Sequence, residues 1–160
     1  LAVAFIVVQF FPIDKTNPAY DAAQDFLAIH QPEAEMATLI KNTCYDCHSH
    51  ETTYPWYTNV APVSWWIKGH IDHGKEHFNF SEFGLYEPGR AAHKLEEAYE
   101  ETEEKHMPLS SYTWMHPEAK LSDEDRTKVV EYFKGLYAAA EQHGGDHDGH
   151  DHDEHSHDDD

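Results

Sequence analysis

Residues 44 to 48 read CYDCH, and they contain both cysteines of the 160-residue chain. Three kinds of site use two cysteines at this spacing. A thiol–disulfide exchange site has C-x-x-C at the start of a helix that follows a strand, because the helix dipole lowers the pKa of the first thiol. A zinc site needs two further ligands, and a c-type haem site needs a histidine directly after the second cysteine. The neighbouring sequence must decide between exchange, zinc and haem.

The sequence around the two cysteines favours haem over the other two kinds of site. Apolar residues at helical spacing lead directly into Cys44, so the motif lies at the end of a helix rather than at its start. His73 and His77 have a spacing that zinc sites use. However, 25 residues separate Cys47 from His73, about twice the usual zinc-finger interval. Exchange and zinc therefore stay as the less favoured alternatives.

A covalent haem accounts for the two cysteines and the histidine of the motif together. Two thiols three positions apart can form thioethers with the two vinyl groups of one porphyrin, and His48 is placed to coordinate the iron from one side. One motif implies one haem. We therefore predict a single covalent haem c, held by Cys44, Cys47 and His48.

Met107 is the predicted second axial ligand of the iron. It lies in an irregular segment far from Cys44 and precedes Pro108, and a capped helix follows, an order similar to that of small class I cytochromes c. Methionine ligation suits electron transfer and raises the reduction potential relative to histidine.

Other side chains could take the place of Met107. Met115 in the same loop is the alternative, whereas Met36 lies on the helix that carries Cys44. Histidines also remain candidates: His106, and His70, His73 and His77, which we expect on one helical face with Trp66.

Three tryptophans are predicted to line the porphyrin: Trp56, Trp65 and Trp66. In that position they would exclude water and so raise the potential of the iron. Packing in an ordinary core is the alternative for each of them. His50 lies two residues beyond the predicted axial ligand, cannot easily turn back to the iron, and is expected to be exposed.

Six segments occur in order along the chain: CYDCHS, YPWY, APVSWW, EHFNFS, HMPLSSY and HPEAKLSDEDR. With them, the chain from about residue 32 to about residue 137 resembles the haem-binding domain family of small bacterial c-type cytochromes, which are often membrane-anchored. The resemblance implies haem attached at Cys44 and Cys47 with His48 as the proximal ligand. It does not extend to the C-terminal tail, and it leaves the redox partner open.

The predicted fold is all-α, because no segment shows the alternation of a strand. We expect a cytochrome c-like bundle of four to five short helices, with long aromatic-rich loops around one haem, in a domain of residues 19–140. The sequence SDED from Ser122 resembles a capping box and predicts the start of the last helix. The expected helices cover about residues 19–28, 32–44, 63–77 and 88–104, and then the segment from 122.

The first eleven residues are apolar apart from Gln9. This is too short to span a bilayer, which needs about 20 apolar residues in a helix. We interpret residues 1–18 as the trailing part of a membrane anchor and its exit segment; a signal-peptide core or a buried terminal element is the alternative. An anchor would place the domain on the periplasmic side of the bacterial inner membrane.

The chain carries a formal charge of -20, which repels phosphate backbones and argues against nucleic acid as a partner. Residues 141–160 form a tail without a folding core and are predicted to be disordered. Imidazoles suit divalent zinc, nickel or copper, so the tail is a possible divalent metal site; a solubilising or pH-responsive tail is the alternative. The candidate ligands are His143, His147, His150, His152, His155 and His157.

Together these features predict a membrane-tethered monohaem cytochrome that carries single electrons between redox partner proteins, one of them a membrane respiratory complex. Electron transfer needs no acid–base residues, and the sequence has no catalytic triad, paired carboxylates or phosphate loop, so we predict a carrier and not an enzyme. The alternatives are a haem sensor or peroxidase-like protein with an open distal site, and a metal-handling protein that acts through its tail.

Overall fold

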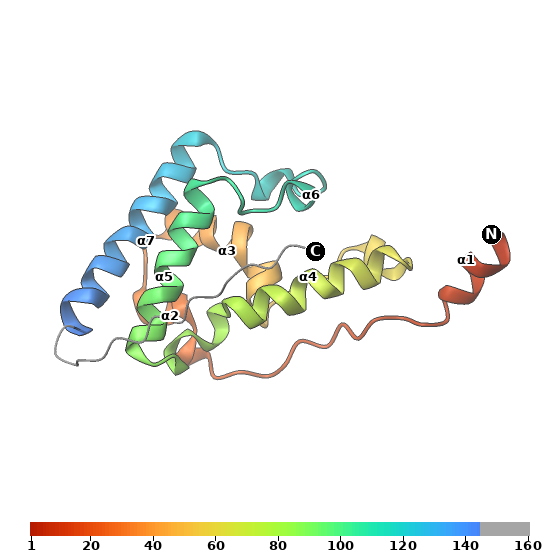
Figure 1. Ribbon diagram of the computed structural model, residues 1–160, viewed down its shortest axis with the longest axis horizontal. Helices are drawn as coiled ribbons and strands as arrows, with labels where there is room; N and C mark the ends of the chain where they lie inside the picture. Colours follow the sequence, from red (N-terminus) through yellow and green to blue (C-terminus); the bar gives the residue numbers. More distant parts are fainter. Residues whose placement is uncertain (145–160) are drawn as a thin grey trace, which may run out of the picture.

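The structure, a computed structural model, describes residues 1–144 (Figure 1). These residues form seven α-helices and four 3-10 segments, and no strand occurs among them, so the predicted all-α class is confirmed. The α-helices are α1 (Ala2–Val8), α2 (Phe26–His30), α3 (Ala34–His48), α4 (Val63–His77), α5 (Pro88–Glu103), α6 (Ser110–Thr113) and α7 (Asp123–Gly144). The 3-10 segments are η1 (Ala22–Gln24), η2 (Trp56–Asn59), η3 (Phe80–Leu85) and η4 (Pro117–Ala119).

The four long helices α3, α4, α5 and α7 lie where the sequence predicts them, and the differences concern short elements. The helix expected over residues 19–28 is divided into η1 and α2. Asp21 accepts a hydrogen bond from the backbone N–H of Ala23, and Asp25 accepts one from Leu27, so each carboxylate begins a new element. The segment between α5 and α7, expected to be irregular, contains α6 and η4.

Helices α5 and α7 run antiparallel and side by side (Figure 1). The predicted capping box begins α7: the Ser122 hydroxyl accepts from the Asp125 N–H at 3.0 Å and donates to the Asp125 carboxylate at 2.7 Å. Lys105, just after α5, pairs with Asp123 at the start of α7 at 3.0 Å, and Lys134 of α7 pairs with Glu103 at the end of α5 at 2.9 Å. The two helices therefore flank the segment that connects them.

An aromatic core joins α2, η3 and α7. Phe26 is fully buried, and its ring centroid lies 5.1 Å from that of Phe80, 5.0 Å from Phe83 and 5.6 Å from Phe133. The pairs with Phe80 and Phe83 are edge-on, a geometry that adds to the free energy gained from burial, which is roughly 1.5–3 kcal/mol for each large side chain. Tyr45 of α3 packs on Phe80 at 5.1 Å, so the core also holds the helix that carries CYDCH.

Helix α1 lies apart from this core, and its residues are exposed or nearly so. The segment after it is tied to the loop before α4. The Gln9 side chain donates to the Ala61 carbonyl at 2.9 Å and accepts from the Ala61 N–H at 3.0 Å, and the Trp65 indole N–H donates to the Phe11 carbonyl at 2.8 Å. Within residues 1–144, none of the helices has the length and apolar character that crossing a membrane requires.

His30 at the end of α2 is a half-buried titratable side chain that packs against the aromatic core. Its ring lies 4.6 Å from the ring of Phe26 and 5.2 Å from that of Phe83, and its Nε2 is buried without a hydrogen-bond partner. Burial lowers the pKa of His30 below its usual value of 6.5. The folded protein therefore binds this proton less readily than the unfolded chain does.

The free energy of unfolding should fall as the pH drops below about 6.5, because His30 then gains a proton in the unfolded chain that the folded protein resists. His30→Phe removes this group, so the stability of the variant should change less between about pH 7.5 and about pH 5.5. Urea unfolding at both pH values measures the change, with His93→Gln as a control because the His93 side chain is 61% exposed. Equal pH dependence in His30→Phe and wild type would contradict this account.

Candidate cofactor site

The motif CYDCH occupies the last turn of α3, as the sequence predicts. Cys44 and Cys47 lie one helical turn apart, and both are free thiols in the structure. Burial raises the pKa of each thiol to about 11, and a hydrogen bond from Thr43 opposes this at Cys44. Thiol–disulfide exchange needs a cysteine whose pKa is lowered. The environment of these cysteines is therefore unlike that of an exchange site.

His48 is the last residue of α3, and the end of α4 fixes its ring. Its Nδ1 lies 3.0 Å from the carbonyl oxygen of Phe78. A carbonyl only accepts, so Nδ1 carries the proton and donates, and Nε2 keeps its lone pair for a metal. Burial lowers the pKa of His48, which favours the neutral imidazole that coordinates iron.

The close packing of α4 on the end of α3 depends on Gly74. A Cβ atom at this position would lie 2.9 Å from the Cys47 carbonyl oxygen and 3.4 Å from His48 Cε1. Glycine is therefore the residue that lets α4 approach the motif closely enough for the Phe78 carbonyl to reach His48.

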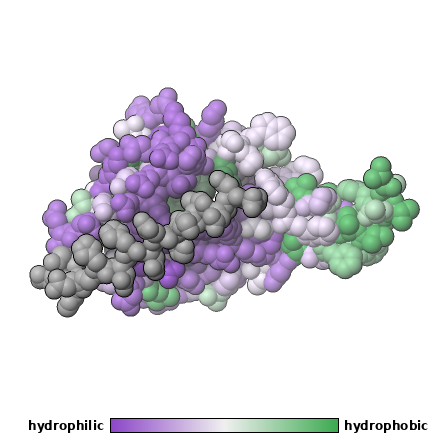
Figure 2. Space-filling model, viewed as in Figure 1, coloured by the Kyte–Doolittle hydropathy of each residue, from purple (hydrophilic) through white to green (hydrophobic). Residues whose placement is uncertain are grey.

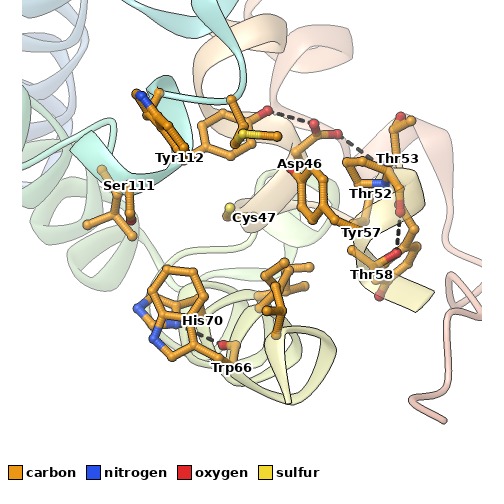
Figure 3. A pocket seen from close by; sticks show the side chains of 18 of the residues that line it. Asp46, Cys47, Thr52, Thr53, Tyr57, Thr58, Trp66, His70, Ser111 and Tyr112 are labelled. Carbon is orange, nitrogen blue, oxygen red and sulfur yellow. Dashed lines mark hydrogen bonds between the residues drawn. The ribbon is translucent and has the colours of Figure 1, made fainter. Parts of the chain in front are cut away.

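Two cavities meet the motif from different sides. The smaller, of about 430 Å³, lies between α3, α4 and the α5–α7 pair; the larger, of about 680 Å³, lies between α3, α4 and the α6 region (Figure 3). Cys44, His48 and Met107 line the smaller cavity, while Cys47 points into the larger one. A group attached to both cysteines would therefore contact both cavities.

Met107 reaches the smaller cavity because two contacts fix its backbone. Its N–H donates to the Glu101 carbonyl at 2.9 Å, which closes the end of α5. Arg126 of α7 donates from Nη1 to the carbonyls of Thr102 at 2.6 Å and Met107 at 2.8 Å. The structure thus brings the predicted axial ligand to the same cavity as His48. Sequence reasoning did not single out Arg126, because its partners are backbone atoms.

The other candidate ligands lie in different places. Met115 lines the larger cavity, Met36 packs against the core, and the side chain of His106 is 62% exposed, 3.4 Å from Glu101 and from Glu104. The expected common face of the α4 histidines is divided. His73 and His77 line the smaller cavity, whereas His70 and Trp66 line the larger one (Figure 3), because α4 passes between the two.

Of the three predicted tryptophans, Trp66 lines a cavity and the other two do not. Trp56 is 73% exposed, and Trp65 turns its indole N–H to Phe11; neither lines the two cavities at the motif. The expectation that His50 is exposed is wrong. Its side chain is 9% exposed and contacts Glu82 at 2.9 Å and Asn79 at 3.2 Å, because η3 folds over it.

Hydrogen bonds close the α6 region over the larger cavity (Figure 3). Asp46, inside the motif, accepts from the Tyr112 hydroxyl at 2.7 Å and from the Thr53 N–H at 3.0 Å. Burial and the Asp46 carboxylate raise the pKa of Tyr112, so this phenol remains a donor. The Tyr57 hydroxyl and His116 Nε2 form a further contact at 2.5 Å. The polar residue between the two cysteines therefore positions the cavity wall.

The zinc alternative requires further ligands beside Cys44 and Cys47. Within residues 1–144, no group of three or more histidine, cysteine, aspartate or glutamate side chains is arranged to hold a metal ion. The zinc alternative therefore has no assembled ligand set in this range. Of the predicted tail ligands, the side chain of His143 and the whole of His147, His150, His152, His155 and His157 lie outside the described residues.

The domain is all-helical, has C-x-x-C-H at a helix end, and holds a fixed histidine ring beside two apolar cavities. These are the features of a haem-binding protein. A family model confirms the class: the haem-binding domain model matches residues 3–135. The chain belongs to this family. No curated protein and no solved structure matches the chain significantly.

The residues present fit a haem on structural grounds. His48 has one nitrogen fixed by a carbonyl and the other able to bind iron. Two thiols lie beside it, and aromatic and apolar side chains dominate both cavities, whose volumes are typical of ligand sites of about 300–1,000 Å³. The site can hold a flat apolar group with one axial histidine.

Gly74→Ala should disturb the site more than an alanine elsewhere on α4. The new methyl group would lie 2.9 Å from the Cys47 carbonyl oxygen, so α4 must move away from α3. This should lower the free energy of unfolding by about 1–3 kcal/mol, and the haem content should fall. Gly69→Ala is the matched control, because nothing lies within 4 Å of its Cβ position. Urea unfolding and the ratio of haem to protein absorbance measure both effects. Equal stability and haem content in the two variants would contradict the packing account.

Proposed function

We propose that the protein is a monohaem c-type cytochrome that carries single electrons between redox partners. The observation that carries the proposal is the arrangement at the end of α3, where Cys44, Cys47 and a carbonyl-fixed His48 meet two apolar cavities. In this proposal the cysteines tether the haem by thioethers and His48 is the proximal ligand. The haem itself supplies the one-electron iron couple.

Met107 is proposed as the second axial ligand. Its support is structural: it lines the cavity that His48 lines, and Arg126 and the end of α5 hold its backbone. A ligand held in this way needs little rearrangement when the iron changes charge, which suits an electron carrier. Trp66 is proposed to exclude water from the haem, since it lines the larger cavity.

A second candidate function has one supporting observation. The exposed side chains of His73 and His77 line the same cavity as His48, so an iron without Met107 would have titratable groups nearby. That arrangement would suit a haem sensor or a peroxidase-like protein with an open distal site. The state of the sixth position therefore separates the two candidates.

We further propose that the protein works at the periplasmic side of the bacterial inner membrane, tethered by its N-terminal segment. The apolar, exposed α1 supports a membrane contact, and the acidic surface favours basic redox partners. A membrane respiratory complex would suit such a carrier. The histidine-rich tail is proposed to bind divalent metal ions as an appendage to the haem function.

The optical spectrum of the ferric protein tests the proposed ligands. Wild type, expressed with haem c maturation, should show the weak long-wavelength band of sulfur bound to ferric iron, and Met107→Ala should lose it. Met36→Ala and Met115→Ala are controls, because Met36 packs against the core and Met115 lines the other cavity. Loss of the band in Met115→Ala alone would reassign the ligand. Absence of the band in wild type, with rapid cyanide binding, would favour the open-site candidate.

A further inference from the structure

All four tryptophans of the chain are exposed. The exposed fractions are 73% for Trp56, 40% for Trp65, 53% for Trp66 and 83% for Trp114. Tryptophan side chains are usually largely buried in soluble domains, so four exposed ones need an explanation. Together with α1, they form what we call the tryptophan-rich end, and Figure 2 shows the strongly apolar α1 region at one extreme of the molecule.

The parts of the tryptophan-rich end are joined to one another. The two hydrogen bonds between Gln9 and Ala61 and the one from Trp65 to the Phe11 carbonyl attach the segment after α1 to the start of α4. Trp66 and Trp114 line the larger cavity from α4 and from the end of α6. The apolar helix and the tryptophans therefore belong to one end of the fold, and α1 is not an independent appendage.

Charge is distributed unevenly between this end and the opposite one. Residues 1–15, 52–72 and 109–116, which build the tryptophan-rich end, contain two acids and two bases in total. Residues 87–105 contain seven acids and three bases, and residues 122–144 contain five acids and three bases. These last two segments are α5, α7 and their flanks, at the other end of the molecule (Figure 1). An anionic surface would therefore repel one end and not the other.

We propose that the tryptophan-rich end rests on the surface of a lipid bilayer. Indole rings have an apolar body and one polar N–H, and they concentrate at the boundary between lipid and water. Helix α1 is apolar on every side, as expected for a helix buried in lipid rather than packed against a protein with a polar rim. Lys15 and Lys68 balance Asp14 and Asp72, with Lys68 paired to Asp72, so this end has no net charge and anionic headgroups do not repel it.

The inference rests on the membrane location proposed above and adds the orientation of the domain. The larger cavity, which Trp66 and Trp114 line, lies on the bilayer side. The smaller cavity, which Glu97 and Glu101 line, lies on the acidic side. A basic partner in solution would then approach the haem from the side of α5 and α7, away from the membrane.

Flotation with vesicles of phosphatidylcholine and phosphatidylglycerol tests this orientation. The holoprotein should float with the vesicles, and Trp56→Ser/Trp65→Ser should bind about tenfold or more weakly, because two indoles no longer enter the interface. Trp56→Ser alone keeps the Trp65 hydrogen bond and should show an intermediate loss. The control is Ile29→Ser/Leu85→Ser, which removes apolar side chains that are 42% and 65% exposed outside the tryptophan-rich end, and it should bind as wild type does.

Several outcomes would overturn the inference. One is a double tryptophan variant that floats as wild type does, since α1 alone would then account for the binding. Another is an equal loss in the control pair, which would indicate nonspecific adhesion. A wild-type protein with an intact haem spectrum that does not bind vesicles would reject the orientation and leave the haem proposal standing. Vesicle binding by a protein without a haem spectrum would reject the haem proposal and leave the orientation standing.

Discussion

The close contact between the end of α3 and α4 is the constraint on which the rest of the site depends. Gly74 has no side chain, so α4 can pack directly on the Cys47 backbone and bring the Phe78 carbonyl to 3.0 Å from His48 Nδ1. That hydrogen bond determines the tautomer and orientation of the ring, and leaves Nε2 for iron. The aromatic core built on Phe26 supports the contact from behind, because Tyr45 and Phe80 join α3 to the segment after α4.

The position of Met107, the proposed second axial ligand, depends on helices α5 and α7. Both helices are acidic, yet Arg126 turns inward and donates to the carbonyl of Thr102 near the end of α5 and to that of Met107 beyond it. A guanidinium can do this with one planar group. Helix α7, which packs in the aromatic core, thus positions Met107 through Arg126. Helix α3, which packs in the same core, positions His48. Both proposed axial ligands are held by elements of the same aromatic core, although about sixty residues separate them.

Local patterns in the sequence predicted the long helices well. The spacing of apolar residues, the prolines and the Ser122 cap act within one or two turns, so α4, α5 and α7 lie where expected. Contacts between distant segments were harder to predict. Nothing near His50 in sequence indicates that η3 covers it, and nothing in SDEDR indicates that Arg126 serves the Met107 segment. The division of His70 from His73 and His77 follows from the position of α4 between two cavities, which periodicity alone does not show.

The central claim is that one haem is attached covalently at Cys44 and Cys47, and its most direct test is retention of haem after the fold is destroyed. The protein, expressed with haem c maturation, would be denatured in detergent, extracted with acidified acetone and stained for haem after electrophoresis. We expect haem to stay on the wild-type chain and to be absent from a Cys44→Ala/Cys47→Ala variant. Complete extraction of haem from the wild-type chain, or haem retained by the double variant, would contradict it.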